Sequence, residues 1–234
     1  MANSVKVHIP NAITCLNLFS GCVGIVFAFQ GQFEIAAFCI LASGIFDFFD
    51  GMVARLLRVS SPMGKELDSL ADVISFGLLP GVFYYQLLGQ TDIGNSYLPF
   101  LAFLVPVFSA LRLAKFNIDE RQQIDFIGLN TPMNAFYVLS LPFIALNQPQ
   151  IIMHPAFLIG SIVVTSLLLV SEVRLFSMKF NSMTWAENRF RYLFLGISAC
   201  LLPLLRFEAI PLILVLYFVF SFLHFRISQT PTQS

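Results

Sequence analysis

Long apolar runs separated by short polar breaks dominate this 234-residue chain. A helix needs about 20 apolar residues to cross the roughly 30 Å hydrocarbon core of a membrane. Runs of this kind predict helices near 11–30, 34–58, 66–90, 97–117 and 152–172, and shorter runs predict three more near 132–147, 190–205 and 207–225. We therefore expect about eight transmembrane helices. Six or seven spans is the alternative, because the break between the last two runs rests on Arg206, Glu208 and Pro211.

The composition supports a membrane protein rather than a soluble globule. Apolar residues make up 57% of the chain and the mean hydropathy is +0.81, whereas soluble domains have about 45 to 50% apolar residues. The four cysteines lie in apolar stretches without CxxC spacing, which argues against a disulfide framework or a zinc site. No repeat or long linker divides the chain, so we expect one all-α polytopic membrane helix bundle over residues 1–234.

The basic residues are distributed unequally between the two sides of this helix map. The chain contains 13 Lys and Arg, of which twelve lie on one side of the predicted membrane and only Arg206 lies on the opposite side. The twelve on the same side are Lys6, Arg55, Arg58, Lys65, Arg112, Lys115, Arg121, Arg174, Lys179, Arg189, Arg191 and Arg226. The positive-inside rule then places both termini in the cytoplasm. A small single chain of this kind indicates a prokaryotic cytoplasmic membrane, and we expect no nucleic-acid partner.

Four aspartates interrupt the apolar pattern within one short segment. A carboxylate in hydrocarbon costs roughly 2.5 to 3.5 kcal/mol on insertion scales, so acids retained in a span indicate function. On helices, Asp47 and Asp50 share one face at i and i+3, and Asp68 and Asp72 share one face at i and i+4. A Ser-Ser-Pro turn at 60–62 predicts that the two helices are antiparallel neighbours. The two carboxylate pairs should therefore converge.

The residues around these acids suit metal and phosphate chemistry. Carboxylate oxygens in this number favour Mg²⁺ or Mn²⁺ over zinc or copper. Gly51 and Gly64 let a ligand approach closely, Ala54 keeps the same face shallow, and Arg55 carries a fork of donors suited to phosphate. Together they predict displacement at phosphorus. The alternative is that the acids form salt bridges at a solvated helix end with Arg55, Arg58 and Lys65.

The pattern Asp47-x-x-Asp50-Gly51-x-x-Ala54-Arg55, followed by Gly64-x-x-x-Asp68-x-x-x-Asp72, resembles the signature of the CDP-alcohol phosphotransferases at every defined position. That resemblance implies a dimeric membrane enzyme with two divalent ions, Mg²⁺ or Mn²⁺. It also implies a six-helix catalytic core over about 10–175, with extra helices over about 190–226. In that family an acceptor hydroxyl attacks the β-phosphate of a CDP-linked alcohol and releases CMP.

The same resemblance implies roles for individual residues. Asp47, Asp50 and Asp68 correspond to metal ligands, and Asp72 corresponds to a ligand that also deprotonates the acceptor. Residues similar to those that bind the CDP moiety are Gly51, Ala54, Arg55 and Ser61, with Gly64 beside them. Asn11 and Thr14, at the mouth of the first span, are candidates for contact with the CDP-lipid, although a Pro-Asn helix start explains them almost as well.

Three further segments resemble the bacterial and archaeal phosphatidylserine synthases within that family. They are Pro10-Asn11 with Thr14, Asn17 and Gly21; residues 68–77; and 110–117 followed by 126–129. This closer resemblance implies that CDP-diacylglycerol is the donor, that L-serine is the acceptor, and that the products are phosphatidylserine and CMP.

Three residues at the end of the fourth predicted span are candidates for holding the acceptor. Arg112 and Lys115 are neighbours at i and i+3, with Asn117 just beyond, and can hold the carboxylate of serine. They can equally bind the phosphate of glycerol 3-phosphate, so phosphatidylglycerophosphate synthesis is the alternative activity. A third interpretation is that they only anchor the helix at lipid phosphates. The non-enzyme alternative is a divalent-cation transporter whose ion path uses the four acids.

Overall fold

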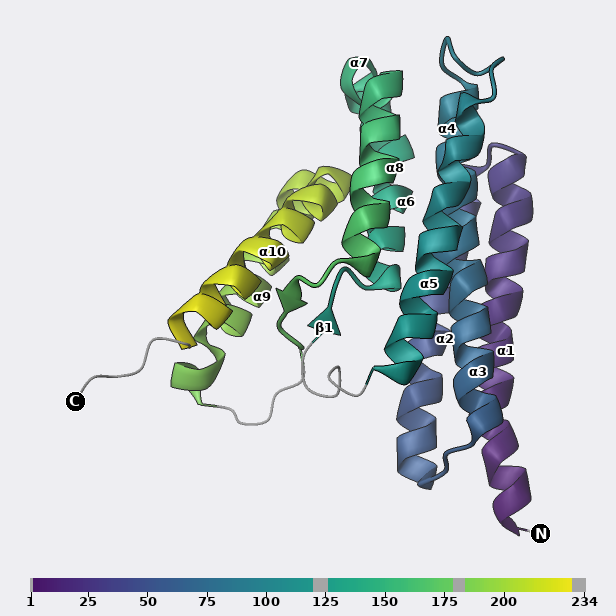
Figure 1. Cartoon of the computed structure of the whole chain (residues 1–234), viewed down its shortest axis with the longest axis vertical. Helices are drawn as coiled ribbons and strands as arrows, with labels where there is room; N and C mark the ends of the chain where they lie inside the picture. Colours follow the sequence, from purple (N-terminus) through teal and green to yellow (C-terminus); the bar gives the residue numbers. More distant parts are fainter. Residues whose placement is uncertain (1, 120–125, 179–183, 229–234) are drawn as a thin grey trace.

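The computed structural model describes residues 2–119, 126–178 and 184–228, and it shows a bundle of long helices (Figure 1). The first half contains α1 (Ala2–Phe29), α2 (Phe33–Leu57), α3 (Pro62–Asp72), the π-helix η1 (Val73–Leu78), α4 (Leu79–Gly89), the 3₁₀-helix η2 (Leu98–Phe103) and α5 (Leu104–Ile118). The second half contains α6 (Thr131–Asn147), α7 (Pro149–Ile152), α8 (Pro155–Val170), α9 (Trp185–Leu205), the 3₁₀-helix η4 (Arg206–Glu208) and α10 (Ala209–Ser228).

A helix occupies each of the eight places predicted from the apolar runs, so the expectation of an all-α membrane bundle is confirmed. The helices long and apolar enough to cross a membrane are Lys6–Phe29, Phe33–Leu57, Pro62–Gly89, Leu98–Ile118 and the stretch Asn188–Arg226 that contains the α9–α10 turn. Large apolar side chains on their outer faces are exposed, for example Phe19 at 66% and Phe38 at 70%. Such a surface suits lipid, because soluble monomers rarely expose large apolar patches.

The helices pack around α4, which is buried along almost its whole length. Its side chains Phe83, Tyr84 and Leu88 are completely buried within a core shared with α2, α6 and α8. Small residues allow the closest helix contacts, as is common between membrane helices. A Cβ added at Gly21 on α1 would lie 2.3 Å from the Ser75 hydroxyl on η1. Helix α1 can therefore pack directly against the segment that follows the acids.

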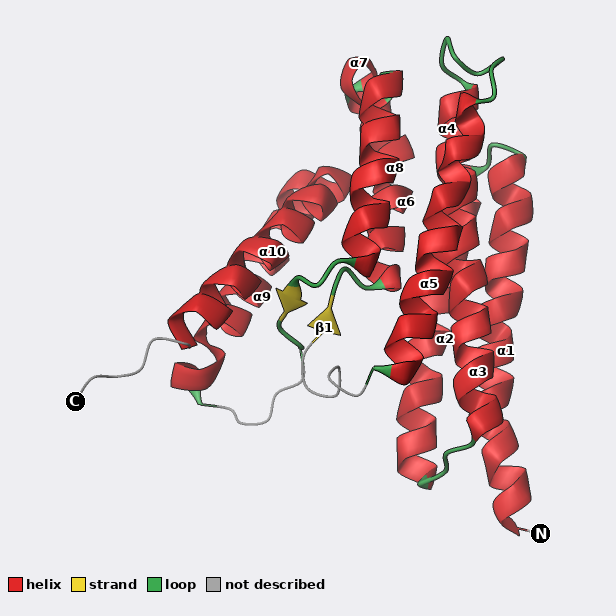
Figure 2. Cartoon of the chain, viewed as in Figure 1, coloured by secondary structure: helices red, strands yellow, loops and turns green. Residues whose placement is uncertain are grey.

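Two short strands, β1 (Phe126–Ile127) and β2 (Arg174–Leu175), form an antiparallel ladder (Figure 2). We did not predict this ladder from the sequence. It joins the segment before α6 to the segment after α8, with Phe126 opposite Leu175 and Ile127 opposite Arg174. The ladder thus fixes the C-terminal helices to the rest of the bundle, and α10 packs against β2.

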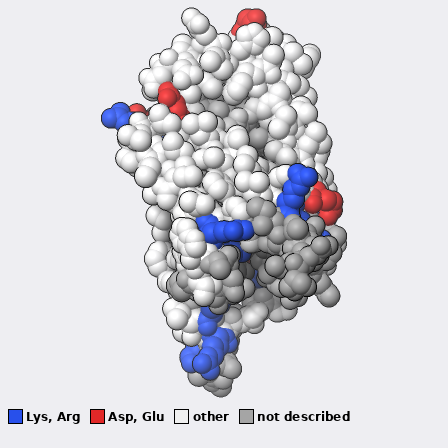
Figure 3. Space-filling model, turned by 90° about the vertical axis from the view of Figure 1, so that its left-hand side faces the viewer, with Lys and Arg blue, Asp and Glu red and all other residues white. Residues whose placement is uncertain are grey.

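The basic side chains on the face shown in Figure 3 lie mostly in the lower half of that view, and one lies near the upper end beside acidic side chains. The first residues of α1 and the last residues of α10 also lie toward the lower end of the bundle (Figure 1). This arrangement agrees with the predicted charge asymmetry, and the number of spans and the side on which the termini lie stay predictions. Two of the basic residues counted above, Arg121 and Lys179, lie outside the described residues.

Candidate active site

A short turn joins the two acid-bearing helices α2 and α3, which both pack against α1. Helix α2 ends at Leu57, and Arg58 follows in a left-handed conformation with φ of 52°. Ser61 caps α3, since its hydroxyl oxygen accepts a hydrogen bond of 2.9 Å from the Gly64 backbone N–H. Pro62 occupies the first helical position, where the absence of an N–H costs nothing. The predicted tight turn is therefore observed, and α3 then packs against α1.

The predicted convergence of carboxylates from the two helices is also observed. Asp47, Asp50 and Asp68 each offer one carboxylate oxygen, and these oxygens lie within 4.8 Å of one another. Asp72, one turn beyond Asp68, is only 8% exposed, and its charge is repelled by those of the other three acids. Four negative groups thus share one small and partly buried region at the end of the bundle formed by the α2–α3 turn, which we name the acid end.

The three cations closest to this cluster in the sequence form no ion pairs with it in the described part of the chain. The Arg55 Nε donates to the Gly51 carbonyl at 2.9 Å, and the Lys65 ammonium donates to the Asn117 carbonyl at 2.7 Å. Within the described residues, Arg55, Arg58 and Lys65 form no ion pair with the four aspartates. The salt-bridge alternative is therefore wrong, because it requires these cations to contact the acids.

The donor set fits a divalent cation. Asp47, Asp50 and Asp68 supply only hard oxygen ligands, which Mg²⁺ and Mn²⁺ prefer. The Asp68 Oδ1 atom is buried and has no hydrogen-bond partner among the described residues, so it is available for a metal. Close carboxylates without a counter-charge repel one another strongly in a region of low dielectric constant. A bound cation would remove that repulsion.

Helix α1 holds Asp72 in place through Asn17, to which we assigned no role from the sequence. The Asn17 Nδ2 donates to the Asp72 Oδ1 at 3.2 Å, and the Asn17 side chain is completely buried. Its backbone carbonyl accepts hydrogen bonds from Ser43 on α2 at 3.1 Å and from Ser75 on η1 at 3.0 Å. One residue therefore connects three elements around the carboxylate. The available sequence signal was an amide in the middle of an apolar span.

A cavity of about 200 Å³ opens beside the acids, between α1, α2 and α3. Its lining includes all but one of the residues predicted to bind the CDP-lipid, namely Asn11, Thr14, Gly51, Ala54, Ser61 and Gly64. Thr14 also donates its hydroxyl proton to the Asp50 Oδ2 at 2.6 Å. The remaining predicted residue, Arg55, is exposed at the edge, where its Nη2 would lie 3.8 Å from a Cβ added at Gly51. The structure thus gathers the predicted donor residues around one space.

Gly64 is the position in this cavity where a side chain fits least well. A Cβ added there would lie 2.9 Å from the Asn11 Oδ1 and 3.1 Å from the Ser61 hydroxyl oxygen. Those distances are shorter than ordinary van der Waals contact, so any larger residue would displace both polar groups. The absence of a side chain at Gly64 keeps the cavity open.

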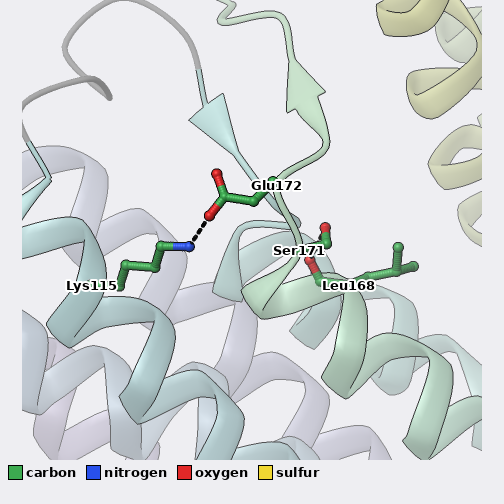
Figure 4. Close-up of polar contacts among 4 residues, drawn as sticks. All are labelled: Lys115, Leu168, Ser171 and Glu172. Atoms are coloured by element: carbon green, nitrogen blue, oxygen red, sulfur yellow. Dashed lines mark hydrogen bonds and ion pairs between the residues drawn. The ribbon is translucent and has the colours of Figure 1, made fainter.

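Of the three predicted acceptor residues, only Arg112 is seen to interact with one of the four aspartates among the described residues. It is 6% exposed, and its guanidinium interacts electrostatically with the Asp72 carboxylate. Lys115 instead forms an ion pair with Glu172 in the segment that follows α8 (Figure 4). That ion pair joins α5 to the connection leading into β2.

Asn117 contacts α3 through both its backbone and its side chain. Its carbonyl accepts the hydrogen bond from Lys65, and its Nδ2 donates to the Ser69 hydroxyl at 2.8 Å. These contacts hold the end of α5 against the helix that carries Asp68 and Asp72. The structure therefore brings Arg112 to the acids, whereas Lys115 and Asn117 have partners that connect helices.

The sequence is similar to a known family and to several named proteins. The sequence model of the family described as CDP-alcohol phosphatidyltransferase matches residues 7–186. A Helicobacter pylori (strain J99) protein named CDP-diacylglycerol–serine O-phosphatidyltransferase is 31% identical over 215 residues, which cover 91% of this chain and 88% of that protein. Proteins of the same name from Bacillus subtilis and Saccharomyces cerevisiae are 35% and 34% identical, covering 58% and 66% of this chain and 76% and 65% of their own lengths.

Proposed function

Because the chain belongs to the CDP-alcohol phosphatidyltransferase family, we propose that it transfers the phosphatidyl group of CDP-diacylglycerol to the hydroxyl of L-serine. The products are phosphatidylserine and CMP. The observation that carries this proposal is the meeting of Asp47, Asp50 and Asp68 within 4.8 Å, beside a cavity lined by the other signature residues. Serine as the acceptor is supported by the names of the relatives and by the buried cation of Arg112.

Two divalent ions, Mg²⁺ or Mn²⁺, are held in this proposal by Asp47, Asp50, Asp68 and Asp72. When bound, such ions neutralise the diphosphate and the charge that develops on the departing CMP. Gly51, Ala54 and Gly64 leave room for the nucleotide, and Arg55 at the cavity edge binds phosphate oxygens. Asn11, Thr14 and Ser61 complete the wall against which the donor lies.

Asp72 acts in this proposal as the base. Its carboxylate, held by Asn17, accepts the proton of the serine hydroxyl as that oxygen attacks the β-phosphorus of CDP-diacylglycerol. The new phosphorus–oxygen bond replaces the bond from the β-phosphorus to CMP, and CMP leaves with the electron pair of that bond. Burial of Asp72 and its fixed hydrogen bond keep the base oriented before the acceptor arrives.

The acid end faces the cytoplasm in this proposal. Twelve of the 13 basic residues fall on the same side of the helix map as the acids, as the positive-inside rule requires. Serine and the CDP head group are water-soluble, so the site must open to the compartment that contains them. The homodimer implied by the family resemblance stays a prediction.

The purified protein, supplied with labelled serine, CDP-diacylglycerol and Mn²⁺, tests the proposed function. We expect CMP release that depends on serine, together with a labelled lipid product. CMP release with glycerol 3-phosphate and not with serine would instead identify a phosphatidylglycerophosphate synthase. If no acceptor supports CMP release, while the protein carries Mn²⁺ across vesicle membranes, the transporter alternative is correct.

Arg112→Ala is expected to raise the KM for serine by roughly ten- to a hundredfold, because a hydrogen bond to a charged group contributes about 1.5 to 3 kcal/mol. The KM for CDP-diacylglycerol should change much less. Lys115→Ala is the matched control, since it removes a cation one turn away that is already paired with Glu172. Steady-state kinetics with each substrate varied in turn makes the measurement. An unchanged serine KM in Arg112→Ala would place the acceptor elsewhere.

A further inference from the structure

Two residues on α5 and two on α6 carry buried polar atoms that lack hydrogen-bond partners among the described residues. The Ser109 hydroxyl, the Arg112 Nε, the Thr131 hydroxyl and both amide atoms of Asn134 find no hydrogen-bond partner among the described residues. Arg112 is 6% exposed, and the other three side chains are completely buried. A buried polar group without a partner is destabilising, and native proteins contain few of them. This concentration therefore needs an explanation.

The two helices that carry these four residues share one neighbour, the π-helix that directly follows Asp72. Ser109 and Arg112 are one turn apart on α5, and Thr131 and Asn134 are one turn apart at the start of α6, so each pair shares a helix face. Both α5 and α6 pack against η1. A Cβ added at Gly77 on η1 would lie 3.0 Å from the Ser109 Cβ.

The C-terminal helix α10 packs against α6, the helix that carries Thr131 and Asn134. The Tyr217 hydroxyl is fixed because it donates to the Phe176 carbonyl at 2.6 Å, and the side chain is 2% exposed. Met133, adjacent to Asn134, packs against the buried cluster that contains Tyr217. Tyr217 lies beyond residue 186, where the family match ends.

We propose that Ser109, Arg112, Thr131 and Asn134 form a zwitterion-binding pocket for the acceptor, which α10 closes through Tyr217. This inference rests on the proposed function and identifies the residues that select an amino acid. The Arg112 guanidinium binds the carboxylate. The neutral oxygens of Asn134, Thr131 and Ser109 accept hydrogen bonds from the ammonium group, and the acceptor hydroxyl then lies toward Asp72.

The chemistry of the pocket favours an amino acid over a phosphorylated alcohol. Glycerol 3-phosphate carries no ammonium group, so the neutral acceptor oxygens would stay buried and unpaired when it bound. A site built to hydrogen-bond a substrate group discriminates strongly against analogues that lack the group. Arg112 by itself could bind either anion, so we assign the selection for serine to Asn134 and Thr131.

Asn134→Leu separates a binding role from a structural role. Because both amide atoms lack partners, replacing them by an apolar side chain of similar size should leave thermal stability unchanged or raise it. The same variant should raise the KM for serine at least about tenfold, with little change in the KM for CDP-diacylglycerol. Ser140→Ala is the matched control, since Ser140 is equally buried on α6 but already donates to the Tyr137 carbonyl at 2.6 Å. We expect the control to keep the serine KM.

The experiment measures the melting temperature in detergent and the serine kinetics of wild type, Asn134→Leu, Ser140→Ala and the isosteric variant Thr131→Val. It also compares serine with 3-hydroxypropionate, which lacks the ammonium group. We expect Asn134→Leu and Thr131→Val to lose most of the preference for serine over 3-hydroxypropionate. Thr131→Val carries the test if Asn134→Leu does not fold.

Two results would overturn the inference in different ways. If wild type uses serine but both variants keep its KM and the preference over 3-hydroxypropionate, the pocket assignment fails and the proposed function stands. If wild type uses only glycerol 3-phosphate, the proposed function fails and the inference fails with it.

Discussion

Asp72→Asn is expected to eliminate phosphatidyl transfer while CDP-diacylglycerol still binds. The amide keeps the shape of the carboxylate but cannot accept the proton of the attacking hydroxyl. Proton transfer by a positioned side chain contributes about 10² to 10⁴ in rate, so kcat should fall at least about a hundredfold. The variant also removes one of four mutually repelling charges, so the fold should be retained. The measurements are CMP release under saturating serine and equilibrium binding of labelled CDP-diacylglycerol.

The control for this variant is Glu66→Gln. It makes the same chemical change on the same helix, six residues earlier in the chain, at an exposed position that does not line the cavity. We expect Glu66→Gln to have wild-type kinetics. Turnover at the wild-type rate in Asp72→Asn would show that another group accepts the proton. If Asp72→Asn loses both CDP-diacylglycerol binding and turnover, Asp72 acts mainly as a metal ligand.

The helices and the acid cluster could be predicted because both depend on local sequence. A membrane helix requires a continuous apolar run, so its position is visible in the sequence without knowledge of its neighbours. The two carboxylate pairs flank a tight turn that ends at the Ser61 cap and Pro62. The short connection forces the two helices to reverse direction, which places the carboxylate pairs close together. The predicted meeting of Asp47, Asp50 and Asp68 was therefore a short-range inference, and the structure confirms it.

The parts that could not be predicted depend on contacts between residues far apart in the sequence. The spacing of i and i+3 predicted that Lys115 and Arg112 act together. Local spacing cannot predict that Lys115 pairs with Glu172, which lies 57 residues later in the chain. The hydrogen bond from Asn17 to Asp72 spans 55 residues, and it requires α1 to pack closely on the end of α3. Apolar periodicity also does not distinguish a π-helix from an α-helix, so η1 was not predicted.

Asn134 shows a further limit of sequence reasoning. Within an apolar span, an asparagine is equally compatible with a hydrogen bond between helices and with a binding site. Only the folded chain shows that this side chain is completely buried and that neither of its amide atoms has a partner among the described residues. The distinction between a structural amide and a binding amide is therefore a property of packing.

Removal of divalent ions is expected to abolish turnover and to lower thermal stability. The Asp47, Asp50 and Asp68 oxygens lie within 4.8 Å of one another without a paired cation among the described residues, so a bound ion relieves their repulsion. A ligand at 100 times its Kd stabilises the folded state by about 2.7 kcal/mol. Titration of chelator-treated protein with Mn²⁺ should therefore raise the melting temperature and restore CMP release over the same concentration range.

Asp68→Asn should shift both responses to Mn²⁺ concentrations at least about a hundredfold higher. Changes in groups that only support metal ligands already cost about 10 to 100 times in affinity, and Asp68 supplies a carboxylate oxygen to the cluster itself. Its buried Oδ1 has no partner in the described part of the chain, so the loss of affinity should not come with a loss of packing contacts. Glu66→Gln again serves as the control and should respond to Mn²⁺ as wild type does. An Asp68→Asn protein that Mn²⁺ stabilises at wild-type concentrations would show that the acid cluster does not hold the ion, and the proposed chemistry would lose its basis.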